Sequence, residues 1–442
     1  MKSAPRSPRS PLSPSRTWSG LERASDTAWA EGLRGIAAVG VVSSHLVLSF
    51  ALDLVPPCDD GPDGDSRFFQ VPLFRLIVQG EAFVALFFIL TGFVNSLKPL
   101  KQSQSSDIEG ALVSLARSSL NRIPRLILPA ATVTIITWFA CQLGFFELAR
   151  QSGAYWMRVN SRQPSISWSK AAQDLVVALT NTWIWGENPY DQPQWAMTYL
   201  LKGSMYIFIL LLITATTRPG FRFVVFGLAY GWSWLSGDGL VGLNVFAGMF
   251  LAELHTTQML PEIRSKALRA LPFFTALLGL YLMSFPADFA GWKPWTRQLK
   301  DIGNVIFPTG VHMGRFWTGI GAQILTASIQ ISPEMRRGLS TRVCTFLGSI
   351  SFSIYLLHGP LMRSVLAWMT FGPSWLINAE LVDDAGFIPP PAGNTLLFIL
   401  PIFASFLVLV ASLWTVKVEP YFGRATKFLQ SLADAEGPIL VK

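Results

Sequence analysis

The sequence contains few charged residues and few cysteines for its length. Only 14% of its 442 residues are charged and 51% are hydrophobic, whereas roughly a quarter of the residues in a soluble domain are charged. This shortage argues against a disordered chain, a nucleic-acid-binding module and most soluble enzymes, even though the formal net charge is +8. Cys58, Cys141 and Cys344 lie far apart in sequence, and three cysteines make neither a disulfide framework nor a paired metal motif. We therefore expect no metal site and no permanently bound cofactor.

Long apolar segments dominate the rest of the chain. Several approach or exceed the roughly 20 residues that an α-helix needs to cross a bilayer. We expect an all-α, polytopic membrane bundle of about ten transmembrane helices, with an error of one or two because the fifth and sixth segments could form one bent element. The ten segments are 29–52, 76–97, 124–146, 200–217, 221–236, 239–254, 270–285, 313–330, 345–369 and 395–416.

The distribution of basic residues predicts the topology, and local composition predicts the domain limits. They concentrate in alternate loops, which places both termini in the cytosol by the positive-inside rule. Residues 1–28 are rich in Ser, Pro and Arg and contain no apolar stretch, so we expect a disordered basic tail rather than a signal peptide. A membrane domain would then occupy residues 29–429, followed by a short tail over 430–442.

The loop from Glu147 to Gln194 is long and rich in tryptophan. Its apolar stretch from Ala171 to Ile184 predicts an interfacial helix packed on the mouth of the bundle. The same stretch is equally typical of a segment that lies on the surface and takes no part in a site.

Two ionisable residues share the first apolar segment. Arg34 and His45 are eleven residues apart, which on a helix is three turns plus about 20° and a rise of about 16 Å, so both lie on one face. Ionisable groups inside a membrane are costly, and they mark functional sites. A shared polar cavity is our preferred interpretation. The alternative is that Arg34 extends to the headgroups and His45 bonds a neighbouring helix.

A second polar face lies in the ninth segment. Ser351, Tyr355 and His358 follow the spacing i, i+4, i+7 and can line one side of a helix, either in a cavity or in a polar patch that joins helices. A neutral histidine can accept the proton of an alcohol. The residues are therefore compatible with acyl transfer to a hydroxyl, and also with proton-coupled transport.

Four sequence stretches, in the same order, resemble the acyltransferase-3 family of integral membrane acyltransferases. The first is the arginine, ten residues, histidine pattern of Arg34 and His45. The others are FFILTGF at 87–93, RIPRLILP at 122–129 and GSISFSIYLLH at 348–358. Each stretch is weak alone, but the four occur in the family's order, and the resemblance runs from about Ala28 to about Leu429. The resemblance is to fungal-type members.

The resemblance implies a reaction and roles for particular residues. The donor would be acetyl-CoA or another acyl-CoA, and the acceptor a hydroxyl of a small lipophilic molecule such as a terpenoid or other secondary metabolite. His45 would be the general base and Arg34 would anchor the donor. The phosphates of the donor would be attracted by Arg122 and Arg125, which are equally well explained as topology signals. Tyr355 and His358 would line the same cavity. A fungal member would lie in the endoplasmic reticulum or another endomembrane.

One position departs from the fungal pattern. Fungal members have a glutamate shortly before Lys-Gly-Ser, and here Leu200 precedes Lys202. The protein would then use another acid, for which Glu81 is a candidate, or would have altered activity. Lys202 is a further candidate for binding donor or substrate. Three interpretations stay open: an O-acyltransferase, a proton-coupled transporter or exporter of a small molecule, and an inactive relative.

Overall fold

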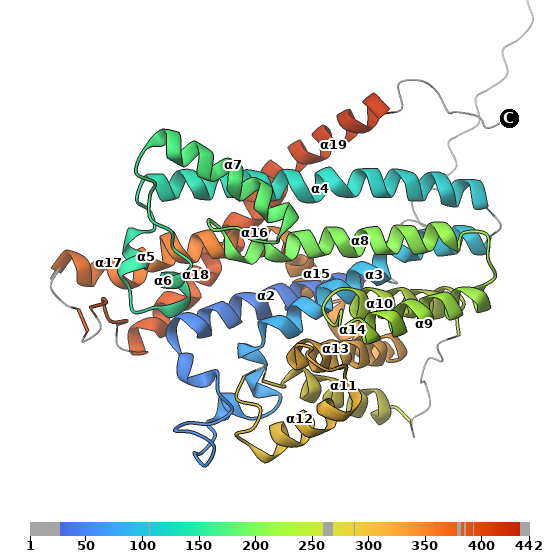
Figure 1. Ribbon diagram of the computed structural model, residues 1–442, viewed down its shortest axis with the longest axis horizontal. Helices are drawn as coiled ribbons and strands as arrows, with labels where there is room; N and C mark the ends of the chain where they lie inside the picture. The colour runs from blue at the N-terminus through green and yellow to red at the C-terminus, as the bar shows by residue number, and fades with distance from the viewer. Residues whose placement is uncertain are drawn as a thin grey trace, which may run out of the picture.

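The computed structural model describes residues 27–105, 107–259, 268–286, 288–377, 382–383, 386–391 and 393–433. Within these ranges the chain is helical, and its only β-type pairing is an isolated bridge between Ser152 and Ile388. The helices form one elongated bundle (Figure 1). The predicted all-α class is confirmed. Residues 1–26 of the tail predicted over 1–28, and residues 434–442 of the tail predicted over 430–442, lie outside the described residues, while residues 430–433 belong to the last helix.

The first half of the bundle contains the longest helices. They and the short elements between them are α2 (Ala28–Phe50), η1 (Leu52–Leu54), η2 (Phe68–Gln70), η3 (Phe74–Val78), α3 (Gly80–Gln104), α4 (Ile108–Gln142), α5 (Glu147–Gln151), α6 (Tyr155–Val159), α7 (Trp168–Ile184), η4 (Gln192–Gln194) and α8 (Trp195–Ile213).

The second half contains shorter helices and two irregular helical turns. Its elements are α9 (Pro219–Leu235), α10 (Gly242–Thr256), α11 (Ala270–Met283), α12 (Pro294–Ile306), α13 (Met313–Ile331), α14 (Pro333–Leu339), α15 (Arg342–Ser349), α16 (Ser351–Leu361), η5 (Met362–Leu366), α17 (Ala367–Ile377), α18 (Gly393–Leu413), η6 (Trp414–Val418) and α19 (Glu419–Ala433).

The number of membrane spans differs from the expected ten. Each of the ten predicted segments is largely helical, but in the described part of the chain five helical stretches are long and apolar enough to cross a bilayer, or six if the bent pair α15 and α16–α17 counts as one. The difference arises mainly in the middle of the chain. There α9, α10 and α11 have 17, 15 and 14 residues, and a span needs roughly 20. The count of ten is therefore not confirmed.

Close backbone packing joins α3 to α10 near the centre of the bundle. A Cβ added to Gly92 would lie 2.1 Å from the carbonyl oxygen of Val245, and one added to Gly248 would lie 2.1 Å from that of Ile89. Small residues allow such an approach where apolar surroundings provide little hydrophobic driving force between helices. This contact fixes α3, whose other side lies against α2.

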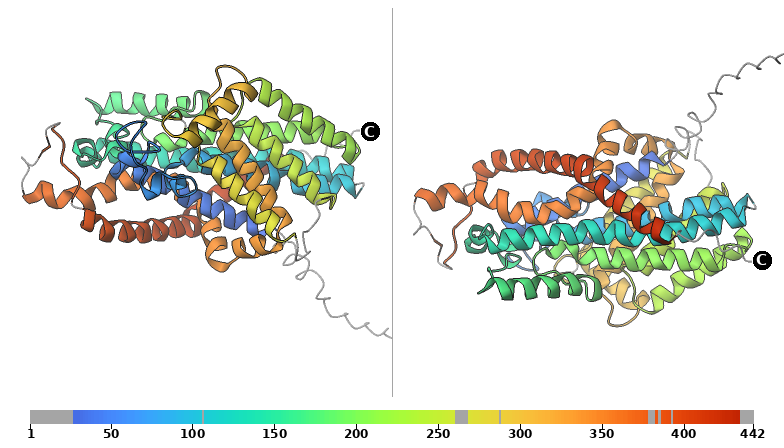
Figure 2. Two further views of the ribbon diagram at one scale, coloured as in Figure 1. Left: turned by 90° about the horizontal axis from the view of Figure 1, so that it is seen from below. Right: turned by 90° about the horizontal axis from the view of Figure 1, so that it is seen from above.

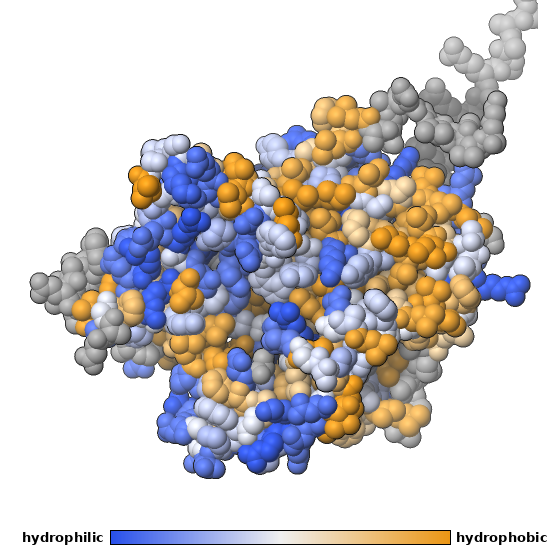
Figure 3. Space-filling model, in the orientation of Figure 1, coloured by the Kyte–Doolittle hydropathy of each residue, from blue (hydrophilic) through white to orange (hydrophobic). Residues whose placement is uncertain are grey.

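The bundle surface is apolar over much of its side. In Figure 3 hydrophobic residues gather over the ends of α8, α9 and α10, while hydrophilic residues gather around α5–α7 and around α12. The exposed face of α9 includes Leu228, Trp232 and Leu235, each more than two thirds exposed. Exposed apolar surface of this extent on helices is what lipid contact requires.

Two peripheral elements cover the long helix α4. The predicted interfacial segment is the helix α7, which lies beside α4, and the indole of Trp138 in α4 donates to the carbonyl oxygen of Ala171 (2.9 Å). On another side of the bundle, α18 packs on α16 and its continuation α19 crosses α4 (Figure 2). The helices that carry the candidate site are therefore enclosed on several sides.

Candidate active site

Two histidines from distant parts of the chain meet at the centre of the bundle. His45 lies on α2 and His358 lies on α16, and the Nδ1 of His45 is 2.9 Å from the Nε2 of His358. The rings are nearly parallel, with an interplanar angle of 11°. The structure thus brings together two residues that the sequence predicted for one cavity. His358 is fully buried, however, and of the two histidines only His45 lines a cavity described below.

The hydrogen bonds of His358 determine which nitrogen of His45 is free. The Nδ1 of His358 is 2.7 Å from the carbonyl oxygen of Tyr355, which can only accept, so this Nδ1 carries the proton. The Nε2 of neutral His358 is then an acceptor, and His45 donates to it from Nδ1. The Nε2 of His45 is left unprotonated. His45 therefore has the tautomer that a general base needs.

The indole of a tryptophan packs on the ring of His45. Trp156, on α6, stacks on His45 with ring centroids 4.4 Å apart and an interplanar angle of 17°. The short helix α6 lies in the long tryptophan-rich loop, whose place in the site the sequence left open. The stacking restricts the rotation of the His45 ring, which complements the hydrogen bond from His358.

A cavity of about 420 Å³ opens beside His45, and we call it the histidine cavity. Its walls come from α2, η3, α3, α8, α13 and α16 and from the segments around residues 192 and 286. The polar residues that line it are Ser44, His45, Arg75, Gln79, Glu81, Gln192, Asp288, Arg315 and Tyr355. Its volume is within the range of small-molecule pockets, which are roughly 300 to 1,000 Å³.

A second cavity of about 390 Å³ lies around Arg34, and we call it the arginine cavity. Arg34 and His45 therefore line two different cavities, and the single shared cavity expected from their spacing is not what the structure shows. Arg34, Arg122 and Arg125 line it together with Glu31 and Glu419. Arg34 donates from Nε to Ser351 (3.0 Å) and from an Nη to the carbonyl oxygen of Gly348 (3.1 Å). The close approach of α15 to α2 makes the second bond possible, since a Cβ on Gly348 would lie 2.1 Å from the carbonyl oxygen of Glu31.

The arginines of this cavity are not neutralised by ion pairs within the described chain. Arg122 donates from Nε to Ser204 (3.0 Å), and neither it nor Arg34 lies within 4.0 Å of a described carboxylate. Guanidinium groups with spare donors bind phosphate well. The cavity therefore has the chemistry to hold the phosphates of a nucleotide donor.

The two cavities meet at α3 and α16. Val84 and Tyr355 line both of them. The Tyr355 hydroxyl donates to the carbonyl oxygen of Pro193 (2.6 Å), which fixes its side chain. A ligand in the arginine cavity and one in the histidine cavity would thus approach each other beside these two residues.

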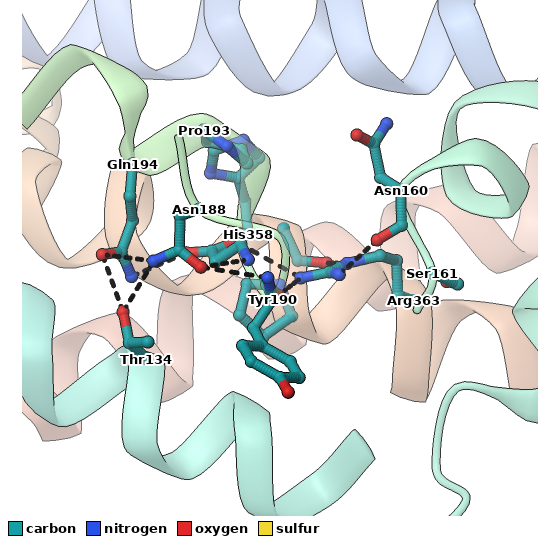
Figure 4. Close-up of polar contacts among 12 residues, drawn as sticks. Thr134, Asn160, Ser161, Asn188, Tyr190, Pro193, Gln194, His358 and Arg363 are labelled. Atoms are coloured by element: carbon teal, nitrogen blue, oxygen red, sulfur yellow. Dashed lines mark hydrogen bonds and ion pairs between the residues drawn. The ribbon is translucent and has the colours of Figure 1, made fainter. Parts of the chain in front are cut away.

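A buried polar network holds the loop before α8 against α16, and the sequence did not reveal it. Arg363 donates to the carbonyl oxygens of Asn160 (2.7 Å) and Tyr190 (2.6 Å), and an Nη lies 3.3 Å from an Asp191 carboxylate oxygen. Figure 4 shows Arg363 reaching toward Asn160 and Tyr190. Burial raises the pKa of the Asp191 carboxyl to about 6, against the opposing effect of Arg363.

Amide side chains extend this network to α4. Thr134 donates to Gln194 Oε1 (2.9 Å) and accepts from Asn188 Nδ2 (2.8 Å). Gln194 in turn donates to Asp191 (3.0 Å). Figure 4 shows Thr134, Asn188 and Gln194 pointing toward one another. The network fixes the backbone that accepts from Tyr355, and so supports the helix that carries His358.

Three other predicted positions lie apart from the histidine pair. Glu81 lies on the wall of the histidine cavity, where its carboxylate is 3.2 Å from Arg315 Nε. Leu200 lines the arginine cavity, so Glu81 does not occupy the place of the missing family glutamate. Lys202 lines neither cavity, and its Nζ is 3.8 Å from Asp238.

Sequence comparisons identify relatives over most of the chain. It is similar to "Acyltransferase R4" of Phoma sp. (25% identity, covering 81% of this chain and 87% of the relative) and to "Acyltransferase clz18" of Cochliobolus lunatus (24%, covering 79% and 85%). It is also similar to "O-acetyltransferase PaAT-1" of Phomopsis amygdali (24%, covering 77% and 73%). No solved structure matches the chain.

A family profile described as an acyltransferase domain matches residues 27–414, nearly the whole chain. The match confirms the resemblance seen in the sequence motifs. It favours an enzyme over a transporter, and the apolar helices are those of a membrane protein. The chain therefore belongs to the acyltransferase-3 family and is a membrane acyltransferase that transfers groups other than aminoacyl groups.

Proposed function

We propose that this protein is an O-acyltransferase that moves an acyl group, an acetyl group in the simplest case, from acyl-CoA to a hydroxyl of a small lipophilic acceptor. The observation that carries this proposal is the hydrogen bonding of the histidine pair, from which we infer an unprotonated Nε2 on His45, a residue that lines a cavity of ligand size. Terpenoids and other secondary metabolites are the acceptor classes that we favour. The relative named an O-acetyltransferase supports the choice of reaction.

The proposed reaction is a direct transfer with His45 as general base. The acceptor hydroxyl, in the histidine cavity, hydrogen-bonds to His45 Nε2, and its oxygen attacks the thioester carbonyl carbon while its proton passes to that nitrogen. The C–S bond of the tetrahedral intermediate then breaks. The coenzyme A thiolate takes up the proton from the His45 imidazolium, so the products are the ester and free coenzyme A.

The arginine cavity is the proposed site for the polar end of the donor. Arg34, Arg122 and Arg125 would hold its phosphates, and its acyl end would extend past Val84 and Tyr355 toward His45. In this arrangement donor and acceptor enter through different cavities. No covalent enzyme intermediate is needed.

The proposed orientation in the membrane follows from the distribution of basic residues. With the positive-inside rule, Arg34 and the arginine cavity face the cytosol, where acyl-CoA is found, and both termini are cytosolic. We propose the endoplasmic reticulum or another endomembrane as the location. The histidine cavity would then lie nearer the opposite face.

The test is acceptor-dependent release of free coenzyme A by the purified protein in detergent, with acetyl-CoA and a panel of terpenoid, sterol and sugar alcohols. We expect release that requires both an acceptor and His45, so His45→Ala should abolish it. Donor binding without release by the wild type would support the inactive relative that Leu200 suggests. Full activity of His45→Ala would remove His45 as the base.

A further inference from the structure

Three arginines are fully buried among the described residues, and they differ in how their charge is balanced. Arg222 forms an ion pair with Glu253 (2.9 Å), and Arg363 forms one with Asp191 (3.3 Å). Arg75, on η3, has no described carboxylate within ion-pair distance. A buried charge without a partner is strongly unfavourable. Of these three fully buried arginines, Arg75 is therefore the one whose charge the described chain leaves unbalanced.

The contacts of Arg75 hold its guanidinium in place without neutralising it. Its two Nη atoms each lie 2.7 Å from a backbone carbonyl oxygen, that of Ser284 and that of Val55. Its Nε is buried and has no hydrogen-bond acceptor in the described chain. Carbonyl groups satisfy N–H donors but carry no net charge, so the guanidinium remains positive and has a spare donor.

Arg75 lies on the wall of the histidine cavity, together with His45. The cavity contains one other arginine, Arg315, which Glu81 already neutralises at 3.2 Å. Asp288, the remaining charged residue of the lining, is exposed to solvent. In the buried part of the cavity, Arg75 is thus the charge without a counterion.

We propose that Arg75 binds an anionic group of the acceptor, so that the natural acceptor is a hydroxy acid whose carboxylate binds Arg75 while its hydroxyl binds His45. The proposal rests on the acyltransferase function proposed above and adds a substrate class to it. The carboxylate of the bound acceptor would be the counterion that the Arg75 guanidinium lacks in the described chain. A neutral alcohol of the same shape would leave Arg75 unpaired and would bind more weakly.

The experiment compares hydroxy acids with their methyl esters. Acetyl transfer from acetyl-CoA is measured for mandelate and lithocholate and for the methyl ester of each, with wild type, Arg75→Gln, Arg75→Lys and Arg67→Gln. Arg67 is the matched control, because it lies in the same loop but is exposed and paired with Asp53 and Asp59. The readout is the ratio of kcat/KM for acid to that for ester.

We expect wild type and Arg67→Gln to prefer the acid. In Arg75→Gln the ratio should fall at least tenfold, which corresponds to about 1.4 kcal/mol, and the change should be mainly in KM. Arg75→Lys keeps the charge and should keep most of the preference. Equal losses for acid and ester in Arg75→Gln would assign Arg75 to the reacting atoms or the fold and overturn the proposal. Equal loss of preference in Arg75→Lys and Arg75→Gln would also overturn it.

A binding measurement separates this proposal from the proposed function. The same acids and esters are tested for raising the thermal unfolding temperature of each purified variant without donor. Stabilisation of the wild type, but not of Arg75→Gln, by the acid alone supports the anion site even if no acceptor is acetylated. Equal acetylation of acids and esters by the wild type would confirm the function and overturn the anion site.

Discussion

The hydrogen bond between the two histidines predicts an unequal pair of mutational effects. His45→Ala removes the base itself, which contributes roughly 10²- to 10⁴-fold to a rate. His358→Ala removes only the acceptor, at 2.9 Å, that fixes the His45 tautomer. A hydrogen bond of this kind contributes about 0.5 to 1.5 kcal/mol. We therefore expect His358→Ala to lower kcat by roughly 2- to 13-fold, with little change in the KM of the donor.

The double variant tests whether His358 acts through His45. If it does, His358→Ala should have no further effect once His45 is alanine, so the double variant should match His45→Ala alone. The assay is release of free coenzyme A under saturating donor and acceptor. His312→Ala is the matched control. His312 is partly exposed, 3.8 Å from Glu81, and is absent from the lining of the histidine cavity, so its replacement should leave kcat within about twofold.

Two results would refute this reasoning. One is a loss in His358→Ala as large as that in His45→Ala, which would give His358 its own role in proton transfer. The other is a double variant whose loss is the product of the single losses, which would show that the two residues act independently.

Three further predictions concern the arginine cavity and the buried network. Arg122→Gln should raise the KM for acyl-CoA about tenfold while kcat changes less. Added salt should weaken donor binding more in the wild type than in this variant. An unchanged KM would exclude binding of the donor phosphates by Arg122. Leu200→Glu should also raise the donor KM, because the new carboxylate would compete with phosphate for Arg122, whereas Leu200→Gln should not. Asp191→Ala should destabilise the protein by about 3 to 5 kcal/mol, since it leaves Arg363 buried without its counterion; thermal unfolding in detergent would show this, and a variant as stable as wild type would contradict it.

The all-α fold class and the central residues of the candidate site could be predicted from the sequence, but the number of spans could not. The helical pattern and the apolar composition indicated an all-α membrane protein, and the spacing from Arg34 to His45 placed both on one face. The motif around His358 suggested a second polar contribution, of which Tyr355 lines both cavities and His358 lines neither. These signals are local, because each depends on residues within one helix.

Features that depend on packing between distant segments could not be predicted. The contact of His45 with His358 joins residues 313 positions apart, and no periodicity reveals such a distance. Asp191 lies in a loop and Arg75 in the short helix η3, both between the predicted apolar segments, where a single charged residue is usually solvated, so nothing in the sequence marked them as buried. The number of spans was uncertain for a related reason, since helices of 14 to 17 residues fall between surface and spanning lengths.

The separation of the histidines along the chain has a consequence for biogenesis. The polar ring of His45 enters the membrane with the first helix, but its hydrogen-bond partner is made 313 residues later. At a synthesis rate of about 5 to 20 residues per second, the ring waits roughly 15 to 60 s for that partner. Until α16 docks, the nascent chain carries an unsatisfied polar group within an apolar helix, which membrane chaperones and proteases can recognise. Docking of α16 would therefore both assemble the candidate site and satisfy the polar ring of His45 within the membrane.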